Sequence, residues 1–233
     1  AITPPIELTI NPLPLFTNTS LIQCDEDGIK DNLTSYNLLE AEGILTNNFA
    51  DRALKFYTSP TNAENSESEI TNYTSFKNTE NPQTIYVNIE DTNSGCLAFS
   101  SFDLIVNLLP DVANLSPIEL CDDEFADGIT QIDLTPNIDD YTQGDPNLTV
   151  SFHYSISDAD SNINAIGFPY YNTNQNETLY VRVNNLSTGC YNIGTQLINV
   201  IDSAKNELIE CFTISADSGF MNIRLHENCP SKL

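Results

Sequence analysis

Two short stretches of the sequence gather carboxylates between a cysteine and a glycine. The first runs from Cys24 to Gly28, as Cys-Asp-Glu-Asp-Gly, and the second runs from Cys121 to Gly128. Calcium takes six to eight oxygen ligands, and a loop bent at a glycine lets neighbouring carboxylates converge on one ion. Neither stretch is a full EF-hand loop, and a solvated acidic turn is the alternative interpretation. The pattern predicts calcium as a cofactor, with the ligands Asp25, Asp27, Asp122, Asp123 and Asp127.

The cysteines are the second set of residues that could bind a metal or form covalent bonds. The six cysteines are Cys24, Cys96, Cys121, Cys190, Cys211 and Cys229. None is spaced as a Cys-x-x-Cys pair, and only two histidines accompany them, so a zinc site is not expected. Their even number and wide spacing, in a chain rich in Asn and Thr, indicate disulfides formed in an oxidising, extracellular setting.

Candidate catalytic residues are scarce. The two histidines are His153 and His226, and neither stands in a recognisable nucleophile motif. His153 lies between Phe152 and Tyr154, so the alternation of a strand predicts that its side chain faces solvent. The sequence also shows no motif for an organic cofactor. We therefore expect no catalytic residue and no cofactor-binding residue, and we do not expect an enzyme.

The charge of the chain restricts its partners. The 33 acidic and 8 basic side chains give a formal net charge of −25. Such a surface repels the phosphates of nucleic acids and the head groups of anionic lipids. No apolar run approaches the 18 residues that indicate a membrane-spanning helix. Neither nucleic-acid binding nor direct membrane insertion is expected.

The acidic stretches and the cysteines recur along the chain with a period near 95 residues. Cys24 and Cys121 open the two acidic stretches and are 97 positions apart. Cys96 and Cys190 each follow a glycine and are 94 positions apart. We therefore expect residues 1–14 to be the closing strand of a preceding repeat and a linker, 15–110 the first repeat, 111–203 the second, and 204–233 the start of a third repeat or a terminal fragment. On this interpretation the chain is a piece of a longer secreted protein.

Alternating apolar residues predict that the repeats are built from strands. The alternation is clear along residues 85–89, 102–106 and 179–183. Short strands, turns rich in Asn and Gly, and about 95 residues per unit predict an all-β fold of tandem immunoglobulin-like antiparallel β-sandwich repeats. A helix over Tyr36–Glu42 is the one expected exception. The proline-containing segment Leu109–Pro117 is expected to be an extended, stiff linker.

Each repeat carries one cysteine before its acidic turn and one after its last hairpin. This placement predicts the disulfides Cys24–Cys96 and Cys121–Cys190 within the repeats, and leaves Cys211–Cys229 as the third pair. Free buried thiols and pairing between repeats are the alternatives, because six cysteines allow 15 pairings.

Several short motifs of the repeat are shared with a known family. They are Cys121-Asp122-Asp123 followed by Asp127-Gly128, the segment Asn81–Val87, the pair Gly95-Cys96, and the segment Phe102–Pro110. With these motifs the chain resembles the tandem repeats of giant surface adhesins of gliding Bacteroidota, the SprB-like substrates of the type IX secretion system. The resemblance covers roughly residues 6–202.

The resemblance implies a non-catalytic adhesin segment on the bacterial cell surface, the repeat stalk of a gliding-motility filament that mediates attachment. Its partners would be surface polysaccharide or an abiotic substratum, together with neighbouring repeats of the same chain. The alternative is a carbohydrate-binding accessory module of a secreted polysaccharide-processing enzyme. In that case exposed tyrosines would stack on sugars, with Tyr86, Tyr170, Tyr171 and Tyr180 as candidates.

Overall fold

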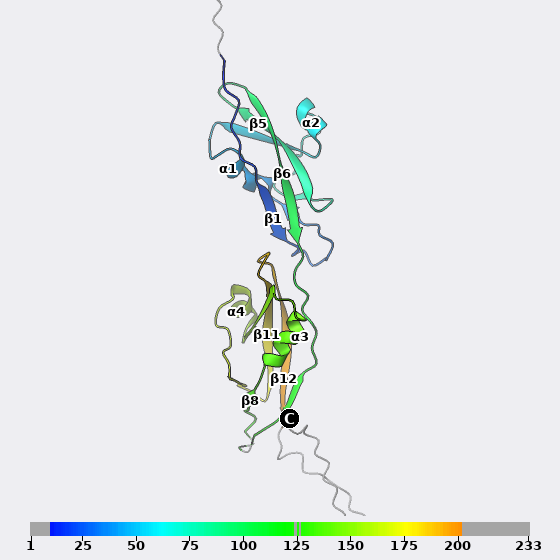
Figure 1. The fold of residues 1–233 in the computed structure, drawn as a ribbon, viewed down its shortest axis with the longest axis vertical. Coiled ribbons are helices and arrows are strands. Elements are labelled where there is room, and N and C mark those ends of the chain that lie inside the picture. Colours follow the sequence, from blue (N-terminus) through cyan, green and yellow to red (C-terminus); the bar gives the residue numbers. More distant parts are fainter. Residues whose placement is uncertain (1–9, 124, 126, 202–233) are drawn as a thin grey trace, which may run out of the picture. The chain divides into compact units, whose positions relative to one another are not determined.

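The computed structural model describes residues 10–123, 125 and 127–201, and these fall into two units that divide between Leu109 and Pro110 (Figure 1). Each unit has its own buried core, so each is described as a domain by itself. Most of residues 1–14 lie outside the described residues, and 10–14 form no strand. Residues 204–233, expected to start a third repeat, also lie outside them.

The first domain is built on a four-stranded sheet in the order β1-β6-β5-β3. These strands are β1 (Ser20–Cys24), β6 (Leu97–Asn107), β5 (Gln83–Asp91) and β3 (Arg52–Tyr57). A smaller two-stranded sheet pairs β2 (Ser35–Tyr36) with β4 (Phe76–Lys77). Three short helices complete the domain: η1 (Leu38–Ala41), α1 (Glu42–Leu45) and α2 (Pro60–Asn65).

The second domain repeats this plan. Its sheet has the order β7-β12-β11-β9, formed by β7 (Ile118–Cys121), β12 (Tyr191–Ile201), β11 (Asn176–Asn185) and β9 (Leu148–His153). The small sheet pairs β8 (Gln131–Ile132) with β10 (Tyr170–Tyr171), and the helices are α3 (Thr135–Thr142) and α4 (Ile156–Ser161). The internal repeat and the prediction of tandem, mostly β, immunoglobulin-like domains are confirmed.

The prediction that the sheets are wholly antiparallel is wrong for the first strand of each domain. β1 runs parallel to β6, and β7 runs parallel to β12. The other pairs in both large sheets are antiparallel. In the first domain the arrowheads of β1 and β6 therefore end at the same pole (Figure 1). Strand alternation could not reveal this, because it is the same for parallel and antiparallel neighbours.

The alternating apolar residues form the cores, as expected. In the first domain Ile85, Val87 and Ile89 are fully buried, and Phe56 and Phe102 on the two neighbouring strands belong to the same buried cluster. The second domain repeats this layer with residues 179, 181 and 183 of β11, packed against Ile198 and Val200 of β12. Each such side chain contributes about 1.5–3 kcal/mol when it leaves water, so the burial of these sheet faces stabilises each domain.

Helices α2 and α4 were not expected from the sequence. Each begins at a serine N-cap, Ser59 or Ser155, whose hydroxyl accepts a backbone N–H three residues later. A side chain of the large sheet donates a hydrogen bond to a carbonyl near the carboxyl end of each helix. In α2 the donor is Asn88 Nδ2, 2.7 Å from the Ala63 carbonyl, and in α4 it is Arg182, 2.9 Å from the Ala159 carbonyl. Six-residue helices are too short for a 3.6-residue periodicity to stand out.

These helices overturn the prediction that His153 faces solvent. His153 is fully buried, and so is its neighbour Phe152, although successive side chains of a strand point to opposite faces. α4 contacts both β9 and β11, so residues on either face of β9 can be covered. The helix expected over Tyr36–Glu42 is present with shifted bounds, as η1 followed by α1 from Leu38 to Leu45.

The segment expected to be a free linker belongs to the second domain. The Pro110 carbonyl accepts a hydrogen bond from Asn192 Nδ2 at 3.1 Å, and the Ser116 carbonyl accepts one from Gln196 Nε2 at 3.1 Å. Val112, between them, occupies the space above Gly194, where a Cβ atom would overlap it. The segment therefore runs along β12, in the same direction as that strand.

Two buried tyrosines give a matched test of the two cores. Tyr36 is fully buried and its hydroxyl has no hydrogen-bond partner, whereas the Tyr141 hydroxyl donates to Gln196 Oε1 at 3.2 Å. Tyr36→Phe should leave the free energy of unfolding unchanged or raise it by up to about 1 kcal/mol, because an unpaired buried hydroxyl is removed. Tyr141→Phe should lower it by about 1–2 kcal/mol, because it leaves the buried Gln196 oxygen without a donor. Denaturant unfolding of the two variants would measure both changes.

The same tyrosines add a pH readout. Burial raises the pKa of Tyr36 and of Tyr141 to about 12 from the usual 10. The stability that this shift represents is complete below pH 10 and is lost as the pH rises from 10 towards 12. Each Phe variant should therefore lose less stability than the parent chain in that window, and an equal loss in parent and variants would contradict the burial of these hydroxyls.

Candidate functional site

The two cysteines of the first domain lie at opposite poles. Cys24 ends β1 and is in register with Asn107, the last residue of β6. Cys96 comes immediately before Leu97, the first residue of β6. Eleven strand positions separate them, which corresponds to about 36 Å. A disulfide requires Cα atoms within about 7 Å, so these two cysteines cannot pair.

The second domain has the same arrangement. Cys121 ends β7 and is in register with Ile201, the last residue of β12. Cys190 comes immediately before Tyr191, which begins β12. About 36 Å again separates the two cysteines, so this pair is also impossible. Each domain thus carries one cysteine at the pole where its first strand ends and another at the hairpin pole.

Both intradomain disulfides predicted from the sequence are therefore wrong. Cys96 is a free thiol, whereas Cys24, Cys121 and Cys190 are disulfide-bonded. The prediction assumed that cysteines within one repeat lie close together. The sequence alone does not reveal that an 11-residue strand separates them. The third predicted pair, Cys211–Cys229, lies outside the described residues.

Counting restricts the pairing further. Three bonded cysteines cannot all pair among themselves, and only two of the six cysteines lie outside the described residues. One disulfide must therefore join two of the three.

The hairpins that present Cys96 and Cys190 are held by the same side-chain geometry. Asp91 Oδ1 accepts the backbone N–H groups of Asn93 and Ser94, and Asn185 Oδ1 accepts those of residues 187 and 188. The glycine before each cysteine has a positive φ, +72° and +76°, as expected for these turns. The hydrogen bond from Ser94 is the main cause that lowers the pKa of Asp91. The turns thus fix the position of each cysteine.

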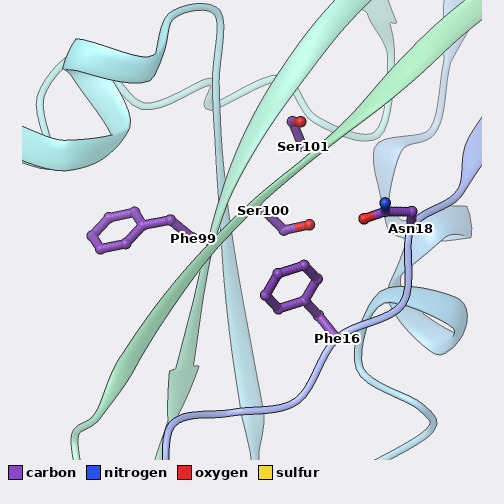
Figure 2. Close-up of a pocket in the computed structure, with 5 residues that line it drawn as sticks. All are labelled: Phe16, Asn18, Phe99, Ser100 and Ser101. Carbon is purple, nitrogen blue, oxygen red and sulfur yellow. The ribbon is translucent and has the colours of Figure 1, made fainter.

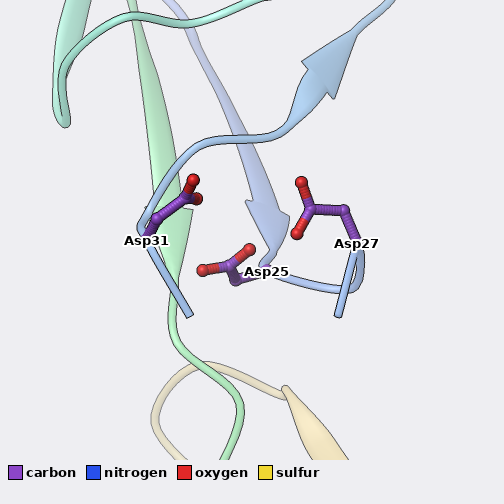
Figure 3. Close-up of side chains that lie close together, drawn as sticks. All are labelled: Asp25, Asp27 and Asp31. Carbon is purple, nitrogen blue, oxygen red and sulfur yellow. The ribbon is translucent and has the colours of Figure 1, made fainter. Parts of the chain in front are cut away.

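The residues predicted to bind calcium gather into two clusters. Asp25 and Asp27 lie together with Asp31, and ligand oxygens of the three are all within 4.8 Å of one another. Figure 3 shows Asp25 between the other two. Asp31 was missed because the acidic turn was taken to end at Gly28. Asp122, Asp123 and Asp127 form the second cluster by the same criterion, so every predicted ligand joins one of the two.

A serine and a histidine in the second domain lie at hydrogen-bond distance. His153 Nδ1 is 2.8 Å from the Ile163 carbonyl, and Nε2 is 2.8 Å from Ser151 Oγ. Because a carbonyl only accepts, Nδ1 carries a proton, and in the neutral ring Nε2 is then the acceptor of the serine hydroxyl. The imidazole is fully buried, so it cannot meet a substrate. The two hydrogen bonds give both ring nitrogens of this buried histidine a partner. His226 lies outside the described residues.

A shallow hollow of about 310 Å³ lies beside β6 in the first domain. It is lined by Phe16, Asn18, Phe99, Ser100 and Ser101 (Figure 2). The Phe16 ring lies next to Ser100, while the Phe99 ring is directed away from it, so the two rings form no common platform (Figure 2).

The tyrosines named for sugar stacking do not form a platform either. Tyr170 is buried, with its hydroxyl bonded to Glu177, and Tyr86 and Tyr180 are half-buried in their sheets. Tyr171 alone of these four is widely exposed, at 53%. A flat sugar site needs several exposed rings on one face, and this set does not provide them.

The family now follows from the sequence and the fold together. The family model described as the Flavobacterium inter-domain disulphide bond domain matches residues 20–110 and 117–204. The chain belongs to this family and carries two tandem copies, one in each domain. Disulfide-bonded immunoglobulin-like domains of this kind belong to an oxidising compartment, extracellular or periplasmic.

Solved structures with tandem domains are distantly similar to the chain. Drosophila OTK extracellular domains 3–5 match at 13% identity, covering 84% of this chain and 62% of that one, with a TM-score of 0.31. The I67–I69 fragment of the titin I-band matches at 12% identity, covering 81% and 64%, with a TM-score of 0.29. The chain thus spans less than two thirds of either structure, and likenesses this weak say nothing of function. No curated protein matches the sequence.

Proposed function

We propose that the chain is a non-catalytic stalk segment in which a disulfide joins Cys24 of the first domain to Cys190 of the second. The observation that carries this proposal is the placement of the cysteines at opposite poles of each domain. A cysteine at the end of the first strand cannot reach its own hairpin, but it can bond the hairpin of the next domain. Repeating that bond gives a covalent chain of domains.

Chain connectivity favours Cys190 over Cys121 as the partner of Cys24. Cys24 is in register with Asn107, and Pro110 follows only three residues later, a reach of about 11 Å. Pro110 is hydrogen-bonded to Asn192, two positions from Cys190. Cys121 lies beside Ile201, about 30 Å farther along β12.

Such a bond changes how a pulling force passes through the protein. Force applied along the chain would cross the Cys24–Cys190 bond and bypass most of the polypeptide of both domains. The domains would then carry little load, and their unfolding would not lengthen the stalk. This behaviour suits a filament that must stay short under tension.

Peptide mapping tests the pairing directly. Trypsin cuts after Lys30, Arg182 and Lys205, so it releases Cys24 in residues 1–30 and Cys190 in residues 183–205. After alkylation of the native protein and digestion without reductant, these two peptides should appear joined, and Cys96 should carry the alkyl group. A 1–30 peptide joined to 78–182 instead would contradict the proposed partner. A Cys190→Ser variant, in which the joined pair must vanish, is the control.

The finer role that we propose is an adhesin segment on the bacterial cell surface, the stalk of a gliding-motility filament exported by type IX secretion. The motif resemblance and the membership in a Flavobacterium family support it. The net charge of −25 would keep neighbouring filaments apart. The partners of the whole filament would be surface polysaccharide or an abiotic substratum, and those of this segment the adjoining domains. No described helix is long or apolar enough to cross a membrane.

Glycan titration separates the stalk from the carbohydrate-binding alternative. A stalk segment should show no saturable binding to soluble polysaccharides in calorimetry. A carbohydrate-binding module should bind, and its affinity should fall about tenfold in Phe16→Ala or Phe99→Ala, which remove the aromatic rings at the hollow beside β6. Phe125→Ala, at an exposed ring of the second domain, is the control. Saturable binding lost in the first two variants alone would overturn the stalk assignment.

A further inference from the structure

The carboxylate of Asp25 is buried, and the hydrogen bonds of the described residues leave one of its oxygens without a partner. Asp25 is only 5% exposed. Its Oδ2 accepts the backbone N–H of Asn32 at 2.9 Å, but its Oδ1 is buried without any hydrogen-bond partner. A buried carboxylate oxygen that lacks a donor is costly, so a group that supplies positive charge at this point would stabilise the fold.

The other two carboxylates of the cluster are already oriented. Asp27 Oδ1 accepts the N–H of Ile29, and Asp31 Oδ1 accepts that of Leu33, each at 2.9 Å. Each of the three aspartates therefore uses one oxygen to fix its own loop and has a second oxygen for a ligand.

The spacing of the oxygens fits one ion. Two ligands at about 2.4 Å from a calcium ion lie at most about 4.8 Å apart. Oxygens of Asp25, Asp27 and Asp31 meet that limit, and Figure 3 shows the three side chains converging. We propose that these three aspartates bind a calcium ion, with Asp25 Oδ1 as its buried ligand. Water and loop carbonyls would complete the shell.

The structure also places a competing charge at this site. Lys77 Nζ is 3.3 Å from Asp27 Oδ2, and its side chain is half exposed. An exposed ion pair of this kind contributes little and leaves the ammonium free to move away. Lys77 would weaken binding without preventing it. Three protein carboxylates and a nearby ammonium are consistent with a dissociation constant of about 10⁻⁴–10⁻³ M, the range of extracellular calcium modules.

The second acidic cluster serves as an internal comparison. Asp122 is also buried, but both of its oxygens already accept backbone N–H groups, from Asp123 and Gly128. No buried oxygen in that cluster is left without a partner among the described residues. Among the described residues the proposal therefore assigns one ion, at the first cluster.

Calorimetric titration of the oxidised chain with calcium chloride tests the site. We expect one ion per chain, with binding weakened at least tenfold in Asp25→Asn and severalfold in Asp31→Asn. Both amides keep an oxygen for the loop N–H, so circular dichroism should show folded variants. Lys77→Met should bind severalfold more tightly, because it removes the competing ammonium. Glu64→Gln, at an exposed carboxylate of α2, is the matched control and should bind as the parent does.

The titration also has clear contrary outcomes. Absence of binding at 10 mM calcium, or binding that Asp25→Asn leaves unchanged, would overturn the site. Magnesium chloride that binds as tightly would overturn its assignment to calcium. The site is independent of the proposed disulfide, so its failure would leave the peptide map untouched.

Discussion

The length of one strand determines most of the chemistry of this protein. β6 and β12 each hold eleven residues. One cysteine of each domain comes just before the first residue of this strand, and the other, on the neighbouring first strand, is in register with its last residue. A strand of that length keeps the Cα atoms of the two cysteines roughly five times too far apart for a disulfide. The parallel pairing of β1 with β6, and of β7 with β12, is what sends the first-strand cysteine to the far pole. Covalent links are thereby directed out of each domain.

The acidic loops lie at the same poles as the first-strand cysteines. Asp25 directly follows Cys24, and Asp122 directly follows Cys121. Hydrogen bonds from the backbone N–H groups of Asn32 and Gly128 hold the loops that follow β1 and β7 around these buried carboxylates. The chain has few basic side chains to balance such groups. A cation from solution is therefore the natural counter-charge where a buried oxygen is left over, and the first loop is where that occurs.

The sequence was sufficient for the repeat, the strand faces and the acidic clusters, because these depend on local spacing. Alternation along β5 and β11 identified the core, and the glycine turns identified the hairpins. It was insufficient where a feature depends on the direction or length of a distant strand. The prediction of the disulfide pairing was wrong for that reason. The burial of His153 was missed because α4 is too short to leave a periodic pattern in the sequence. Asp31 lies beyond the glycine at which the turn was thought to end.

Force spectroscopy of the oxidised chain, pulled from its two ends, tests the central claim most directly. If Cys24 is bonded to Cys190, the 166 residue steps between them are closed to extension, which hides about 600 Å of contour length. The account predicts that this length is missing under oxidising conditions and appears when a reductant is added or in Cys190→Ser. Full extension of both domains in the oxidised parent chain would contradict it.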